Sequence, residues 1–124
     1  MSVSDRLSCQ VQVYADGVHL IVMGEIDYRS RDLFDGAVQT VLTGYPGRIV
    51  LDLTAVRFVS SEGISSLVDA AHRAASAGST LTIVTSPPVW RRLDLLGLTQ
   101  ILTVTSAADP PTTLDFPAPA HRAQ

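Results

Sequence analysis

The apolar run at residues 48–53 restricts the possible folds of this chain more than any other feature. Ile49, Val50 and Leu51 follow one another, and Leu53 comes two residues later. A strand with one face in water would alternate apolar and polar residues, so this run predicts a strand that is covered on both faces. Central strands of α/β sheets, which lie between helices, have this pattern.

Strand-type and helix-type patterns alternate along the rest of the chain. Strands that alternate with helices pair in parallel, so the order β-β-α-β-α-β-α-β predicts an α/β domain with a mixed, mostly parallel sheet and helices packed alongside it. Asp16-Gly17 suits a tight turn, which makes the first two strands an antiparallel hairpin. The expected elements are strands at 7–15, 18–23, 48–53, 80–84 and 98–104, and helices at 30–44, 61–78 and 86–97.

Residues 54–60 are predicted to be a connecting loop, in which Val56, Phe58 and Val59 turn against the core. The buried face of the following helix is expected to repeat every three or four residues. Its expected members are Ile64, Leu67, Val68, Ala71 and Ala75.

The length and composition predict one domain followed by a tail. A chain of 124 residues is long enough for a single core, and residues 1–105 carry all the expected elements. Residues 106–124 are rich in Pro and Ala and have little to bury. They are predicted to form a flexible tail.

Charge and cysteine content exclude several classes of protein. The nine basic residues are scattered and the formal net charge is −3, so no surface for a nucleic-acid backbone is expected. Cys9 is the single cysteine, which indicates a reducing compartment. No signal-peptide pattern is visible, and no apolar run approaches the ~20 residues of a membrane span. The sequence therefore predicts a cytoplasmic protein that binds no membrane.

No pattern of metal ligands or catalytic groups is evident. His19, His72 and His121 are too far apart to have ligand spacing. The chain has no Gly-rich phosphate loop, nucleophile elbow or paired acid and base. Asp52 is expected to accept hydrogen bonds from loop amides before the second helix. We therefore expect no metal, no cofactor and no enzymatic activity.

The informative stretch is the point where the second helix begins. Ser60 and Ser61 stand there, beside amide groups that a helix leaves unpaired in its first turn. One interpretation is that either serine is only an N-cap. The other is that a hydroxyl is exposed there for a partner or a modification. Gly63 costs helix propensity, roughly 1 kcal/mol against Ala, and leaves room for the close approach of another backbone or of a partner.

Four motifs give this chain a resemblance to the STAS domain, as found in anti-sigma factor antagonists. Leu-Asp-Leu-Thr at 51–54 and Phe-Val-Ser-Ser-Glu-Gly-Ile at 58–64 are similar to its central signature. Gly-Glu-Ile-Asp at 24–27 is similar to the end of its second strand. Arg-Arg-Leu-Asp-Leu-Leu-Gly-Leu at 91–98 resembles its late helix. The resemblance covers about residues 7–105.

The resemblance implies regulation by partner switching. Such a protein binds an anti-sigma factor that is also a serine kinase and thereby frees the sigma factor, and it is released when the kinase phosphorylates it. Residue by residue, the phosphoacceptor is Ser61. Ser60 stands where the family has Asp and Glu62 where it has Ser or Thr, which leaves Ser60 as an alternative acceptor. The partner-binding residues expected on this basis are Asp27, Arg57, Ser60, Ser61, Glu62 and Gly63.

Other readings stay open at this point. A STAS-type chain also serves as a non-phosphorylated adaptor subunit of a stress-signalling or lipid-transport assembly. A small enzyme is the third reading, and the missing catalytic set argues against it. A homodimer is neither required nor excluded by the sequence. Arg29, Arg31 and Arg57 are candidates to surround Ser61 and meet an acidic partner surface.

Overall fold

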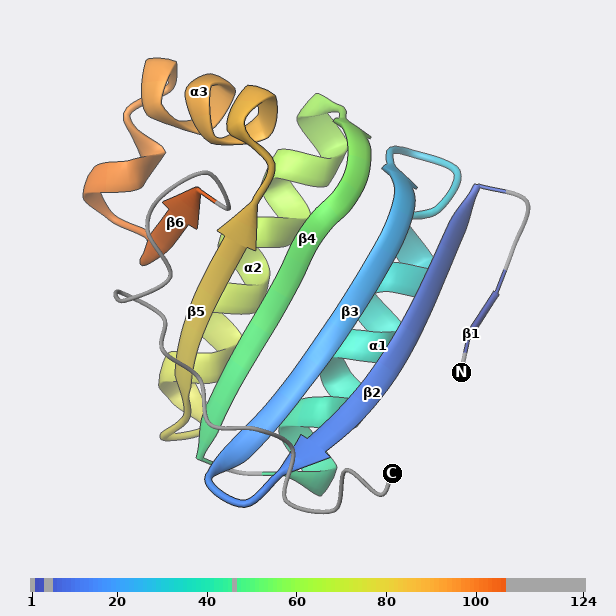
Figure 1. Cartoon of the computed structure of the whole chain (residues 1–124), viewed down its shortest axis with the longest axis vertical. Coiled ribbons are helices and arrows are strands. Elements are labelled where there is room, and N and C mark those ends of the chain that lie inside the picture. Colours follow the sequence, from blue (N-terminus) through green and yellow to red (C-terminus); the bar gives the residue numbers. More distant parts are fainter. Residues whose placement is uncertain (1, 4–5, 46, 107–124) are drawn as a thin grey trace.

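A mixed β-sheet is the frame of the domain (Figure 1). The computed structural model describes residues 2–3, 6–45 and 47–106. Within them, six strands follow one another in the order β1-β2-β3-β4-β5-β6. The strands are β1 (Ser2–Val3), β2 (Leu7–Tyr14), β3 (Gly17–Ile26), β4 (Arg48–Val59), β5 (Thr80–Thr85) and β6 (Val104–Ser106). Strands β1 to β3 pair antiparallel and strands β3 to β6 pair parallel, which confirms the predicted α/β class with a mixed sheet.

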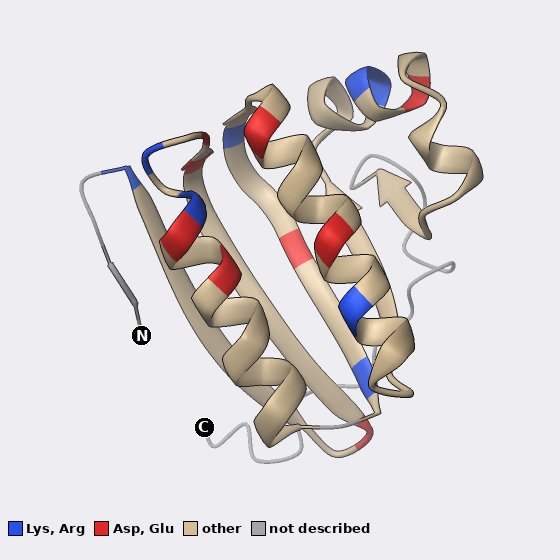
Figure 2. Cartoon of the chain, turned by 180° about the vertical axis from the view of Figure 1, so that it is seen from behind, with Lys and Arg blue, Asp and Glu red and all other residues tan. Residues whose placement is uncertain are grey.

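Helices α1 (Arg31–Gly44) and α2 (Ser61–Ser76) lie side by side on one face of the sheet, as Figures 1 and 2 show from opposite sides. Helix α3 (Pro87–Leu95) and a 3₁₀ turn, η1 (Leu98–Gln100), connect β5 to β6 at the edge. The buried apolar residues of α1 and α2 pack on alternate residues of β2 to β5. They are Phe34, Ala37, Val38, Val41, Leu42, Leu67, Ala70 and Ala74.

The predicted buried face of α2 is partly wrong. Leu67 is buried as expected, and Ile64 and Val68 are partly buried. Ala75 is exposed, whereas Ala74 is buried. Alanines occupy several neighbouring positions on this helix, so their pattern alone does not fix its rotation.

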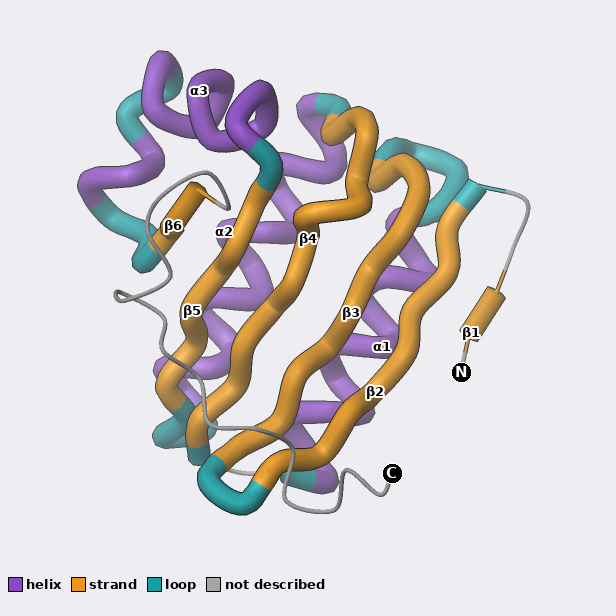
Figure 3. Tube along the Cα trace, in the orientation of Figure 1, coloured by secondary structure: helices purple, strands orange, loops and turns teal. Residues whose placement is uncertain are grey.

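The loop expected at 54–60 is wrong, because β4 continues to Val59. In this region β4 has two more residues than the part of β3 with which it pairs. The first extra residue lies between Asp52 and Ala55, which pair with Ile21 and Met23, and the second is Arg57. Such bulges break the two-residue period of a strand, which explains the loop-like pattern. Figure 3 shows the trace of β4 stepping sideways in this region.

The bulges also decide which side chains of this segment reach the core. Val56 and Val59 are buried, as predicted. Phe58 was expected to pack inward, yet 49% of it is exposed. It therefore belongs to the surface near the start of α2.

Three further differences lie outside the central strands. The hairpin turn uses Ala15 and Asp16, one residue earlier than expected. The strand predicted at 98–104 is wrong: η1 comes first, and the amide of Leu102 donates to the carbonyl of Leu98 (2.8 Å), so β6 begins only at Val104. Ser106 is the last residue of β6, and the rest of the predicted tail lies outside the described residues.

The helices cover only one face of the sheet, although the run at 48–53 predicts cover on both. Ile49 and Leu51 belong to the core beneath the helices. Val50 alternates with them and points to the opposite face, where it is nonetheless only 2% exposed.

Candidate functional site

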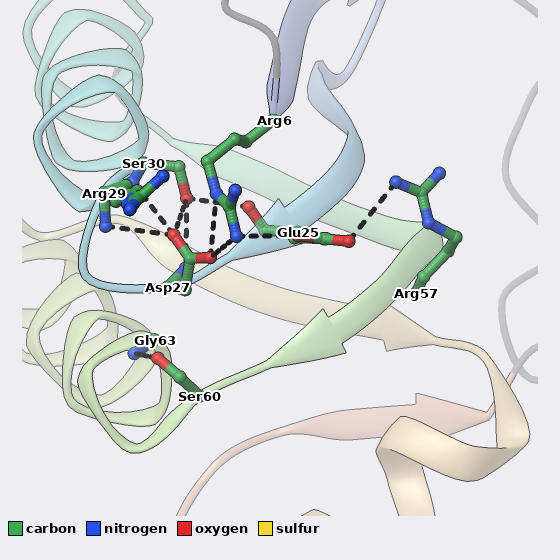
Figure 4. Close-up of polar contacts among 8 residues, drawn as sticks. All are labelled: Arg6, Glu25, Asp27, Arg29, Ser30, Arg57, Ser60 and Gly63. Atoms are coloured by element: carbon green, nitrogen blue, oxygen red, sulfur yellow. Dashed lines mark hydrogen bonds and ion pairs between the residues drawn. The ribbon is translucent and has the colours of Figure 1, made fainter.

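Ser60 caps the N-terminus of α2. It stands directly after β4 in an extended conformation (φ −78°, ψ 179°), and its Oγ accepts a hydrogen bond from the amide of Gly63 at 3.1 Å (Figure 4). Its own amide donates to the carbonyl of Ile26 at the end of β3 (2.9 Å). The Ser60 hydroxyl is thus engaged in holding the first turn of the helix.

Ser61 is the first residue of α2 and is exposed. Within the described part of the chain its hydroxyl makes no hydrogen bond, unlike that of Ser60. Glu62 follows and is exposed as well, in the turn where the helix dipole favours acidic groups. The site therefore presents a reachable hydroxyl beside a carboxylate.

Gly63 is buried, and the backbone of Ile26 approaches it closely, which is one of the two alternatives expected for this glycine. A Cβ at this position would collide with the carbonyl oxygen of Ile26 and lie 2.7 Å from Cγ1 of Val59. The absence of a side chain lets α2 begin against the end of β3. Gly63 thus brings Ser61 to its place without forming the exposed surface.

Asp27 is held by a network of polar contacts on the neighbouring turn (Figure 4). Its Oδ2 accepts from Nε and from a terminal nitrogen of Arg6, at 3.0 and 2.6 Å. Its Oδ1 accepts from the amides of Arg29 and Ser30, at 3.0 and 3.1 Å. Asp27 is only 8% exposed, so it shapes the turn before α1 and offers little contact surface to a partner.

Glu25 extends this network toward β4. Its carboxylate meets Arg6 at 3.1 Å and Arg57 at 3.5 Å. In the pair between Glu25 and Arg57, 71% of the Arg57 side chain is exposed to solvent. Such a pair contributes little to stability, so Arg57 remains available to a partner.

Ser30 stabilises the turn between β3 and α1. It precedes α1, but its hydroxyl makes no capping bond. Its Oγ donates to the carbonyl of Glu25 (2.7 Å) and accepts from the amide of Asp27 (3.0 Å). The side chain therefore closes the β3–α1 turn on itself.

The lowered pKa of Asp27 predicts how the stability of the fold depends on pH. The Arg6 hydrogen bonds lower the pKa of Asp27 from 3.8 to about 2. In the unfolded chain this carboxyl takes up a proton at higher pH than in the folded chain, so the stabilisation is complete above about pH 4 and is lost as the pH falls toward 2. We expect urea unfolding measured across this window to show a steeper loss of stability in the native chain than in Asp27→Asn. Asp69→Asn, an exposed change on α2, is the control and should keep the native slope; an unchanged slope in Asp27→Asn would contradict the assignment.

Charged groups of both signs gather where α1 and α2 begin (Figure 2). Of the three arginines expected near Ser61, Arg31 pairs with Asp35 on α1 at 3.4 Å and Arg57 pairs with Glu25. Arg29 is exposed beside Asp27. The arginines thus surround the neighbouring turn, and no contact with Ser61 is among their interactions in the described residues.

Sequence reasoning missed Arg6 entirely. It lies 21 residues from Asp27, and nothing in the local sequence indicates the pairing. Exposed Tyr28 (78%) and Phe58 (49%) were also not predicted as surface residues. The only available signal for Tyr28 is its place in a turn directly after the Gly-Glu-Ile-Asp motif.

Two other expectations concern chemistry elsewhere in the chain. Asp52 lies mid-strand and accepts from the amide and hydroxyl of Thr54, at 3.0 and 2.7 Å, so it does not shape the turn before Ser61 as predicted. Among residues 6–45 and 47–106, no group of three or more His, Cys, Asp or Glu side chains is placed to hold a metal ion. Within the same ranges, no helix has the length and apolar character needed to traverse a bilayer.

Comparisons with known proteins agree with this architecture. A crystal structure of an anti-sigma factor antagonist from Mycobacterium paratuberculosis is similar, with a TM-score of 0.75 and 25% identity over 92% of this chain and 97% of that one. The anti-sigma factor antagonist SpoIIAA in its unphosphorylated form has a TM-score of 0.66 and 15% identity, over 87% and 94% of the two chains. The Bacillus cell fate determinant SpoIIAA in its phosphorylated form gives 0.61 and 14%, over 87% and 97%.

The last two likenesses show the fold alone. A search of curated protein sequences found no match. The family model described as "Mlab, STAS domain" matches residues 9–110, which is most of the sequence. The chain therefore belongs to this STAS domain family.

Proposed function

We propose that this protein is an anti-sigma factor antagonist that binds an anti-sigma factor of the serine-kinase type and is released when Ser61 is phosphorylated. The observation that carries the proposal is the exposed, unbonded hydroxyl of Ser61 at the start of α2. Similar folds in structures described as anti-sigma factor antagonists support it. The protein acts by binding in this proposal and catalyses no reaction itself.

The geometry favours Ser61 over Ser60 as the acceptor. Phosphorylation of Ser60 would place a bulky phosphate ester on the oxygen that already accepts the Gly63 amide, so the cap of α2 would have to rearrange. Phosphorylation of Ser61 leaves that bond in place. It adds about −1.5 to −2 charges at a helix N-terminus, which tolerates them. The domain therefore keeps its fold while its surface changes.

The docking surface in this proposal surrounds the start of α2. Phe58 and Arg57 precede Ser61 on β4, and both are exposed. Tyr28 lies two residues after Ile26, whose carbonyl receives the amide of Ser60. Two exposed aromatic rings and a guanidinium are residue types that anchor protein interfaces. A phosphate amid them would bring both bulk and an unpaired charge into the contact.

A second candidate is a non-phosphorylated adaptor of a multi-protein assembly. The observation that favours it is Glu62, whose exposed carboxylate stands next to Ser61 and repels an incoming phosphate. Ser60 in place of the family's Asp points in the same direction. In this case the same surface binds a partner constitutively.

Phosphate mapping separates the two candidates. The protein is incubated with ATP and a serine-kinase anti-sigma factor from the same genome, and the modified residue is located by mass spectrometry. We expect one phosphate, on Ser61, in the native chain and in Ser65→Ala, an exposed control one turn further along α2. Ser61→Ala should remain unmodified and still bind. Phosphate on Ser60 alone would overturn the assignment, and binding without any phosphate would favour the adaptor.

A further inference from the structure

The sheet face opposite α1 and α2, called here the open face, carries an apolar centre. Ile49, Leu51 and Leu53 of β4 point toward the helices, so Val50 between them points to the open face. Val84 of β5 does the same, since Ile83 beside it belongs to the helix-side core. Because paired residues share a face, the register adds the surrounding members of the open face: His19, Ile21, Met23, Asp52 and Thr82.

The centre of the open face is almost inaccessible to solvent. Val50 is 2% exposed and Val84 is 5% exposed. Yet Figure 1, which looks onto this face, shows no helix or strand of the described residues lying across it. Exposure rises toward the margin, where Met23 is 47% exposed. The unbroken apolar run of β4 is itself the pattern of a strand with cover on both sides.

His19 borders the apolar centre of the open face. It pairs with Val50 across the sheet, and its ring stacks on Tyr14 at 4.3 Å between centroids. Burial is the main cause that lowers the pKa of His19 below its ordinary 6.5.

We propose that residues 107–124 of the same chain, which lie outside the described residues, dock on the open face with Leu114 and Phe116 over Val50 and Val84. The segment begins close to the open face. It follows Ser106, at the end of β6, which pairs with β5 next to β4. The distance from β6 to β4 is two strand spacings, about 10 Å. The eight residues from 107 to 114 span up to ~28 Å when extended, so Leu114 reaches the apolar centre with length to spare.

The sequence of the segment suits this site. Leu114 and Phe116 are two residues apart, so both point the same way in an extended chain, while Asp115 between them points to solvent. Prolines at 110, 111, 117 and 119 favour an extended backbone and lack an amide donor. The segment is therefore suited to lie across a sheet face by its side chains, and poorly suited to add a strand at an edge.

Methyl NMR on the full-length protein tests this docking. With labelled Ile, Val, Leu and Met methyl groups, we expect nuclear Overhauser effects between the Phe116 ring and the methyls of Val50 and Val84. Phe116→Ala and Leu114→Ala should shift those methyl signals. Leu95→Ala is the matched control, because Leu95 is 87% exposed on α3, and it should leave them in place.

Two results would overturn the proposal. The first is that the Val50 and Val84 methyl signals do not respond to Phe116→Ala and show no contact with the ring. The second is that the contact weakens on dilution, because then a second copy of the chain supplies the ring. A contact that persists on dilution identifies the segment of the same molecule. None of these outcomes depends on the function proposed for Ser61.

Discussion

Replacing Gly24 with alanine is expected to lower the free energy of unfolding by about 3 kcal/mol. Gly24 has a φ of +114°, and holding a residue with a side chain there costs about 1–3 kcal/mol. The added Cβ would also collide with the backbone carbonyl of Arg6, and overpacking of this kind costs about 1–3 kcal/mol. The same carbonyl accepts the amide of Glu25 at 2.9 Å, so the strand has no free direction in which to move.

Gly36→Ala is the matched control for this measurement. Gly36 lies in the interior of α1, is exposed, and has nothing within 4 Å of an added Cβ. Alanine there should raise stability by about 0.5–1 kcal/mol, because glycine is a poor helix former. Chemical denaturation of both variants gives the comparison. Equal effects of the two substitutions would show that the close approach of the Arg6 carbonyl to Gly24 does not exist in solution.

Ser61→Asp is expected to weaken binding of the anti-sigma factor roughly 100-fold, equivalent to about 2.8 kcal/mol. The substitution puts a negative charge on the exposed first residue of α2, next to Glu62. In the free protein that charge is solvated and favoured by the helix N-terminus. Under a bound partner it loses water without gaining a counter-charge, and an unpaired buried charge costs several kcal/mol. Titration calorimetry with the purified partner measures the change.

The control keeps the charge and moves it along the helix. Ser65 is exposed on α2, one turn after Ser61, so Ser65→Asp makes the same change in net charge outside the proposed surface. We expect it to bind nearly as tightly as the native chain. If both variants bind like the native chain, the partner does not cover the start of α2. If both lose affinity equally, net charge and not the position of Ser61 controls the interaction.

The order of elements was predictable because local patterns determine it. The continuous run at Ile49–Leu51, the turn residues at Asp16 and Gly17, and the spacing of apolar residues in α1 each indicate their element without information from the rest of the chain. The position of Ser61 at the start of α2 followed from the same reasoning. Its exposure could be stated only once the packing of the first turn was known.

The errors arise where distant segments determine the local structure. Residues 54–59 look like a loop because two bulges shift the period of β4, and those bulges exist only in relation to β3. Asp27 was expected to bind a partner, and its pairing with Arg6 was not foreseen because no local pattern connects the two residues. The run Leu98–Val104 has strand-type composition, yet the contact between Leu98 and Leu102 curls it into a turn.

The bulges in β4 restrict how many residues this segment can contain. Between Leu53 and Ser60, β4 contains two bulges relative to β3. The side chains at 54, 55, 57 and 58 are exposed to water. Packing of the core therefore does not fix which residues stand there, whereas removal or insertion of a single residue would exchange inward and outward positions up to the start of α2. Related chains should therefore agree in the number of residues between the end of the buried run and the start of α2.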